Sequence, residues 1–218
     1  LYHNDVKTLE TTATGANIIA STSRRLSTST SGEDLVLTSF HQTNNRLREF
    51  QMAGYILKFF TGSNGSDTST TEKMRIASGG QVTMSAQPAF EAYHNGGAYD
   101  SGSTVSSIDL NSVRLNRGSH YNTSNDRFTA PVAGVYVFNY RTIVYGNYDN
   151  AHIRMFKNGS QIAGSDSHYT ADTGNNWNSW ELQIIVSLAA NDYVQVAHTG
   201  NTAIHGGDYQ SFNGYLLG

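Results

Sequence analysis

The 218-residue sequence contains no cysteine and only two prolines. The absence of cysteine excludes disulfides and thiolate metal sites. The scarcity of proline excludes a proline-rich linker, and the glycines do not recur with a period of three, which excludes a collagen stalk. No apolar run approaches the length of a membrane span, and no secretory signal is visible. We therefore expect no membrane insertion, and we expect packing and chain association to provide durability.

Charge is also sparse, since Asp, Glu, Lys and Arg make up 14% of the residues and the net charge is −3. Neither half of the chain carries a basic stripe, so we expect no binding to nucleic acid. Hydrophobic residues reach only 38%, whereas Gly, Ser, Thr and Asn are abundant. That mixture favours short strands joined by many turns. Because the chain starts at Leu1, the sequence also suggests a piece of a longer polypeptide.

The composition changes near residues 85–88, which divides the chain into residues 1–85 and residues 86–218. The first part is a series of short, weakly apolar segments separated by polar turns such as residues 63–71. Residues 55–60 (YILKFF) are too apolar to remain unpaired, so a flexible linker is disfavoured. We predict a slender β shaft in which three identical chains wrap around one another and cover each other's thin apolar faces.

Residues 86–218 carry stronger strand patterns. Residues 135–145 are apolar or aromatic on both faces of a strand, which indicates a strand covered on both sides. Asn158-Gly159 lies between two extended runs and predicts a hairpin. Residues 181–200 read as two strands around an Ala-Ala-Asn-Asp turn. The final residues 211–218 predict a last strand in the middle of a sheet, because Phe212, Tyr215, Leu216 and Leu217 would otherwise be exposed. The fold class is therefore an all-β sandwich.

Four sequence elements in this order resemble the C1q/tumour-necrosis-factor-like globular domain, over roughly Pro88 to Gly218. The matching residues are Phe90; Asn116, Gly118 and Tyr121; Phe128, Pro131, Gly134, Tyr136 and Phe138; and Phe212, Gly214, Tyr215, Leu216 and Leu217. The resemblance implies a ten-stranded jelly roll that packs as a compact homotrimer. All of these are packing or turn residues, so the resemblance predicts architecture better than function.

Residues 1–15 and 70–84 resemble segments of bacteriophage tail-fibre shafts. With a C1q-like head after such a shaft, we predict the tip of a phage tail fibre, in the virion and extracellular. Its head would bind a host surface polysaccharide or outer-membrane protein without chemistry, and its N-terminal side would contact other tail proteins. The alternatives are a trimerisation cap for a structural fibre, a polysaccharide-degrading tailspike, and a cellular secreted C1q-like lectin.

The loop at residues 169–181 is the candidate ligand site. It surrounds Trp177 and Trp180 with Asn, Asp and Ser, the residue types with which proteins stack on sugars and bond their hydroxyls. Trp180 is expected to pack in the core, whereas Trp177 either covers a trimer seam or forms the sugar platform. The candidate ligand-binding residues are Trp177, Tyr145, Tyr148, His168, Tyr169 and Asn176.

No sequence motif indicates catalysis, so we predict that the protein is not an enzyme and needs no cofactor. The eight histidines include no two at the i, i+2 or i, i+4 spacing of metal ligands, although one His on a threefold axis would give three ligands by symmetry. The predicted loops supply carboxylates, the ligands that calcium prefers, so calcium is the metal that they could bind. The calcium candidates are Asp149, Asp166, Asp172 and Asp208.

Overall fold

The structure is a computed structural model that describes residues 56–61, 71–100, 106–145, 151–169, 177–199 and 203–218, together with six short strands before residue 50. The chain divides into two compact units, Leu1–Leu57 and Lys58–Gly218. Apart from one short 3-10 helix, η1 (Gly207–Tyr209), the described residues form strands and turns. No helix in the described ranges has the length and hydropathy to cross a membrane. The predicted all-β class is confirmed.

The first unit contains three separate two-stranded pairings. They join β1 (Tyr2–His3) to β2 (Val6–Lys7), β3 (Leu9–Thr12) to β4 (Gly15–Ile18), and β5 (Phe40–His41) to β6 (Arg46–Leu47). The structure describes short hairpins here, not an intertwined trimeric shaft, and that shaft stays a prediction. The predicted division between residues 85 and 86 falls inside the second unit and also stays a prediction.

A small three-stranded sheet contains β7 (Leu57–Thr61), β8 (Thr71–Ile76) and β9 (Val82–Thr83). Phe59 and Phe60 on β7 are exposed in the single chain. Glu72 of β8 accepts hydrogen bonds from both Arg75 Nε and Nη2 at 2.7 Å. Hydrogen bonding from Arg75 outweighs burial and holds the pKa of Glu72 below its ordinary value.

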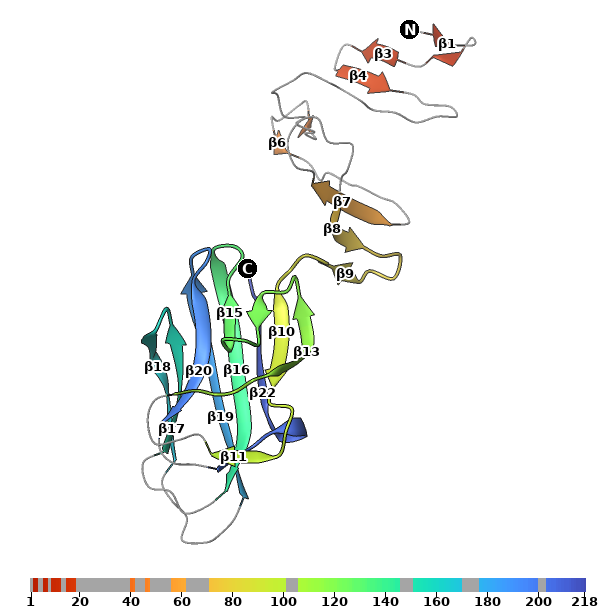
Figure 1. Ribbon diagram of the computed structural model, residues 1–218. Coiled ribbons are helices and arrows are strands. Elements are labelled where there is room, and N and C mark those ends of the chain that lie inside the picture. Colours follow the sequence, from red (N-terminus) through yellow and green to blue (C-terminus); the bar gives the residue numbers. More distant parts are fainter. Residues whose placement is uncertain are drawn as a thin grey trace. The chain divides into compact units, whose positions relative to one another are not determined.

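The larger sheet of the head has seven strands (Figure 1). Its order is β11 (Ala98–Asp100), β21 (Ala203–His205), β16 (Gly134–Tyr145), β22 (Ser211–Leu216), β10 (Ala89–Tyr93) and β13 (Ser112–Arg117), and β19 (Trp177–Leu188) pairs with β16. The last strand, β22, thus lies between β16 and β10, as the sequence predicts.

The second sheet has six strands. Its order is β14 (Tyr121–Asn122), β15 (Arg127–Thr129), β20 (Tyr193–Thr199), β17 (Ala151–Lys157) and β18 (Ser160–Tyr169), and β12 (Ser106–Ser107) pairs with β20. Asn158 and Gly159 take φ of 51° and 80° between β17 and β18, which confirms the predicted hairpin. The two sheets contain more strands than the ten implied by the resemblance, because short strands such as β11, β12 and β14 extend them.

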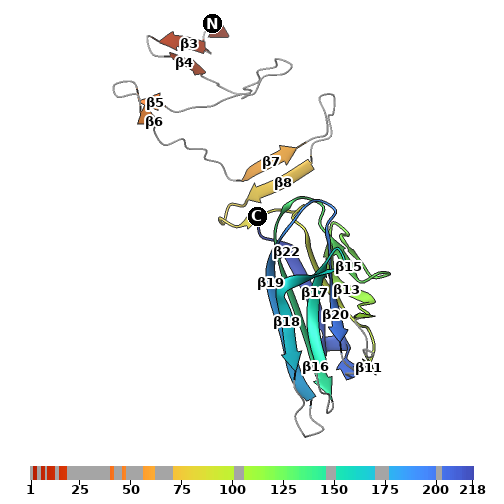
Figure 2. The same ribbon diagram turned by 90° about the vertical axis from the view of Figure 1, so that its left-hand side faces the viewer.

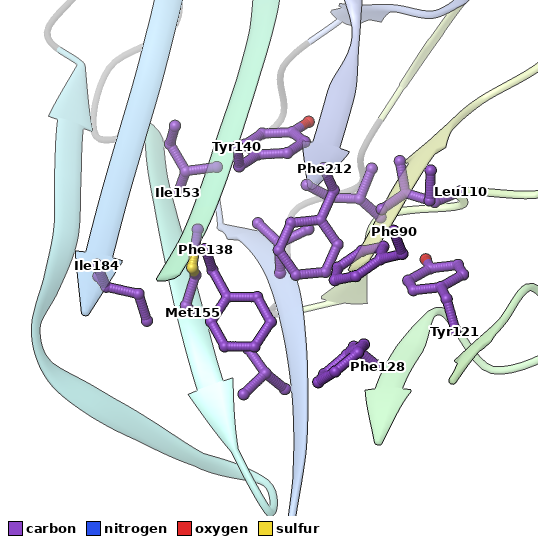
Figure 3. Packing of buried hydrophobic residues seen from close by; sticks show 14 of the residues in the cluster. Phe90, Leu110, Tyr121, Phe128, Phe138, Tyr140, Ile153, Met155, Ile184 and Phe212 are labelled. Atoms are coloured by element: carbon purple, nitrogen blue, oxygen red, sulfur yellow. The ribbon is translucent and has the colours of Figure 1, made fainter. Parts of the chain in front are cut away.

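Aromatic residues from both sheets form the core (Figure 3). The Phe90 ring stacks on Tyr121 and on Phe128, each with ring centroids 4.9 Å apart, and meets Phe212 edge-on at 5.1 Å. Trp180 is buried, and its Nε1 donates to Ser167 Oγ at 2.8 Å, which joins β19 to β18 where the strands run side by side (Figure 2). The predicted core position of Trp180 is confirmed.

The end of the chain is held by backbone hydrogen bonds. Val135 N donates to Gly218 O, and Leu217 N donates to Val135 O, both at 2.8 Å. Of the four apolar residues expected to be covered there, only Phe212 is fully buried, while Tyr215 and Leu217 are exposed in the single chain. These two residues lie on the face turned away from the core, because alternate residues along the strand point to opposite faces, so the sandwich alone does not cover them.

Candidate functional site

The side of the seven-stranded sheet that faces away from the core carries an exposed apolar row, and we call this side the outer face. Tyr215 of β22 and Ile185 of β19 stand on either side of Val137 of β16, each paired with it in register. Tyr215 is 44% exposed and Ile185 is 66% exposed. Val137, which lies between them, is only 5% exposed. Leu115 of β13 adds a further exposed apolar side chain. Such a row on an otherwise polar surface indicates a contact with another molecule.

Beside the apolar row lies a row of amides that bond to one another. Gln183 Nε2 donates to Asn139 Oδ1 at 2.6 Å, and Asn139 Nδ2 donates to Asn213 Oδ1 at 3.2 Å. Asn213 Nδ2 donates in turn to Ser211 Oγ, which donates to Glu91 Oε1 at 3.0 Å. The row crosses four strands. Because these groups already satisfy one another, covering them costs less than covering unpaired amides.

A shallow cavity of about 220 Å³ lies over the amide row. Asn139, Gln183 and Asn213 line it, together with Arg141 and Glu181, which pair across β16 and β19. The outer face therefore combines an apolar row, a bonded amide row and a pair of opposite charges. This combination suits a protein partner, including a second copy of the same face. Such a partner can offer apolar groups to the apolar row, polar groups to the amides and opposite charges to Arg141 and Glu181.

The predicted ligand residues are only partly brought together. Trp177 is 44% exposed, and its ring lies 5.0 Å from that of His205, which lies 4.5 Å from the ring of Tyr209. Tyr145 pairs with Trp177 in the sheet. Sequence reasoning missed His205 and Tyr209, which come from a strand and a helix far along the chain. A binding role for Trp177 stays a prediction.

The other candidates lie elsewhere or outside the described residues. His168 and Tyr169 end β18, and their neighbour across the hairpin is β17. Tyr148 and Asn176 lie outside the described residues, as do the calcium candidates Asp149 and Asp172. No group of three or more His, Cys, Asp or Glu in the described ranges has the arrangement of a metal site.

The two remaining calcium candidates, Asp166 and Asp208, make separate contacts with different residues. Asp166 bonds to Arg154 and His152, whereas the exposed Asp208 pairs with Arg114 at 3.4 Å. Burial raises the pKa of Asp166, but hydrogen bonds from His152 and Arg154 outweigh it and lower that pKa below its ordinary value. Both of these carboxylates thus already lie beside an arginine, and calcium binding stays a prediction.

His198 of β20 is fully buried between the sheets, with its ring 5.3 Å from Trp180 and 6.1 Å from Tyr140. Burial lowers its pKa to about 3. The unfolded chain takes up this proton near pH ~6.5, so below that pH the unfolded state binds more protons than the folded state. Acid therefore weakens the fold through this residue.

We predict that the free energy of unfolding falls by about 2 kcal/mol more between pH 7 and pH 5 in the parent chain than in His198→Phe. Urea titrations at several pH values measure the difference. Parallel pH profiles in the two proteins would contradict the prediction.

The described residues define a two-sheet β sandwich of the jelly-roll type with an exposed apolar row on the outer face of its larger sheet. The C1q domain family matches residues 89–217, more than half of the chain. The chain therefore belongs to the C1q domain family, and the resemblance found in the sequence is confirmed.

Several curated mammalian proteins are similar to the chain. The mouse complement C1q tumor necrosis factor-related protein 3 is 31% identical over 118 residues, which cover 51% of this chain and 45% of the relative, and the human protein is 30% identical over the same shares. The human complement C1q and tumor necrosis factor-related protein 9A is 28% identical over 115 residues, or 50% of this chain and 33% of the relative. The match thus spans less than half the length of these relatives.

Two solved structures are similar to the chain. The globular domain of the zebrafish complement 1qA protein matches with a TM-score of 0.44 and 15% identity, over 61% of this chain and 98% of that one. The Eiger TNF of S. frugiperda matches with a TM-score of 0.48 and 12% identity, over 61% and 94%.

The predicted phage setting is wrong. The relatives are mammalian C1q/TNF-related proteins, which overturns the tail-fibre tip, its virion location, its bacterial receptor and its alternatives of a fibre cap and a tailspike. The error came from residues 1–15 and 70–84. Short polar strand segments of this kind are set by turn and β propensities that unrelated proteins share, so they identify no particular family.

Proposed function

We propose that residues 86–218 form a non-enzymatic extracellular module that assembles as a homotrimer through the outer face. The exposed side chains of Tyr215 and Ile185, on either side of the covered Val137, carry the proposal, because a single chain leaves both in water. Burying such a row removes apolar surface from water at about 25 cal/mol per Å². The family resemblance, which implies a compact trimer, supports the same assembly.

The amide row makes this face suitable for burial. Asn139 accepts from Gln183 and donates to Asn213, so a partner chain can cover these groups while their hydrogen bonds persist. Kinship with mammalian C1q/TNF-related proteins supports the extracellular setting. Catalysis has no part in this proposal.

The predicted shaft belongs to the same proposal. Phe59 and Phe60 are exposed on β7 in the single chain, and neighbouring copies would cover them if the threefold association continued through residues 1–85. In solution the assembly would have three times the 23.8 kDa mass of one chain.

We predict that Ile185→Glu converts the trimer to a monomer, because it places three carboxylates in an apolar contact. Analytical ultracentrifugation of both proteins at equal concentration measures the change. Thr129→Glu is the matched control, since Thr129 is an exposed strand residue of the six-stranded sheet. A parent chain that sediments as a monomer, or an Ile185→Glu protein that stays trimeric, would refute the proposed assembly.

A further inference from the structure

The hairpin of β17 and β18 brings together two histidines that are 16 residues apart in the sequence. His152 and His168 are directly paired across the two strands, and their rings stack with centroids 4.4 Å apart and planes 22° from parallel. Ile153 and Met155, which alternate with His152 along β17, are buried in the core. His152 therefore lies on the solvent side of the six-stranded sheet, and His168 is exposed beside it.

Asp166 orients one of the two rings. His152 Nδ1 lies 2.7 Å from Asp166 Oδ1, and an ionised carboxylate can only accept, so Nδ1 carries the hydrogen. The lone pair of the neutral ring is then on Nε2. A carboxylate bonded to the far nitrogen of an imidazole is the arrangement that orients metal-binding histidines in proteins.

Arg154 fixes the carboxylate from its other oxygen. Its Nε donates to Asp166 Oδ2 at 2.9 Å, so the carboxylate is held between Arg154 and His152. The charges of Arg154 and Asp166 offset one another, which leaves the surroundings of the two imidazoles near neutral. The cation must therefore be held by nitrogen coordination rather than by attraction to excess negative charge.

We propose that His152 and His168 bind a divalent transition-metal ion, Zn²⁺, Cu²⁺ or Ni²⁺, through their Nε2 atoms, with Asp166 as the positioning residue. Imidazole is a ligand that these ions share, whereas Ca²⁺ and Mg²⁺ require oxygen ligands. Two nitrogens about 2 Å from one ion lie roughly 3.3 Å apart in a tetrahedral site. The rings, now stacked with planes 22° from parallel, must therefore turn out of the stack on binding until both Nε2 lone pairs point at the ion.

The protein supplies two ligands to this site, consistent with the absence of any three-ligand group in the described ranges. Water would fill the remaining positions, and a donor from another molecule could replace it. The site lies on the sheet opposite the outer face, so it would stay accessible in the proposed trimer. It does not depend on that assembly.

Isothermal titration calorimetry of the whole chain with ZnCl₂, NiCl₂ and CuCl₂ tests the site. We expect one binding event per chain that weakens at least tenfold in His168→Ala and about tenfold in Asp166→Asn, because loss of the orienting carboxylate typically costs that much. The order of affinity should place Cu²⁺ first. CaCl₂ should produce no such event.

The matched control is His94→Gln. His94 Nδ1 also lies beside a carboxylate, 3.0 Å from Asp109 Oδ2, but His94 follows β10 and lies outside the hairpin of β17 and β18. This variant should bind each metal as the parent does. Equal losses in His94→Gln and His168→Ala would assign the binding to scattered histidines and overturn the proposal, as would unchanged binding in His168→Ala.

Electron paramagnetic resonance of the Cu²⁺ complex counts the nitrogens bound to the ion. That number would not change in His168→Ala if His168 had only a structural role. The parent should show splitting from two nitrogens, and His168→Ala from one. Zn²⁺ should also raise the melting temperature of the parent, since binding to the folded hairpin alone stabilises it. A one-nitrogen spectrum in the parent would overturn the paired site.

Discussion

Phe90→Ala is expected to lower the free energy of unfolding by about 3–5 kcal/mol. Phe90 lies at the centre of the core, stacked on Tyr121 and Phe128 and in edge contact with Phe212. Removing the ring takes away its buried area and leaves a cavity that β10, paired on both sides, cannot close. Urea denaturation followed by circular dichroism measures the loss.

Phe90→Leu serves as the graded control, because it keeps most of the apolar volume and should cost less than about 2 kcal/mol. Both variants must be compared with the parent at one protein concentration, since an assembling chain unfolds at a concentration-dependent midpoint. Equal losses in the two variants, or a loss below about 1 kcal/mol in Phe90→Ala, would contradict the central role of this ring.

Gly214→Val is expected to cost about 3 kcal/mol by the opposite mechanism, overpacking. A Cβ at Gly214 would lie 2.5 Å from Phe138 Cδ1 and 2.9 Å from Phe90 Cε1. Both rings are fully enclosed, so neither can move aside cheaply. Thermal and urea unfolding should both detect the loss.

Gly97→Ala is the control for the glycine substitution. A Cβ there meets nothing within 4 Å, and its φ is not in the left-handed region. It should change stability by less than about 0.5 kcal/mol. A tolerated Gly214→Val would mean that the aromatic core adapts more freely than its packing indicates.

The sequence predicts the head well because its strongest signals are local. The Asn158-Gly159 turn, the run at residues 135–145 and the central position of the last strand all follow from short patterns that turn chemistry and burial dictate. The landmark aromatics, such as Phe128 and Phe138, pack together as expected. Each of these features depends on neighbours within a few residues or on burial alone.

The candidate sites could not be predicted from local sequence patterns, because they depend on strand register and topology. His152 and His168 meet only because a hairpin with an irregular register places them opposite one another. The amide row draws Gln183, Asn139 and Asn213 from three strands whose order depends on the whole topology. The phage prediction was wrong for a related reason. Short strand segments show β propensity, but they do not identify the protein family.

The central position of β22 has a consequence for synthesis of the chain. β10 and β16 are each bridged by this strand, and Glu91 bonds to Ser211, which lies 120 residues later. Until β22 leaves the ribosome, β10 and β16 each present an edge to whatever strand is near. The head therefore completes its sheet late, and in that interval nascent chains held side by side on one messenger are most exposed to exchanging strands.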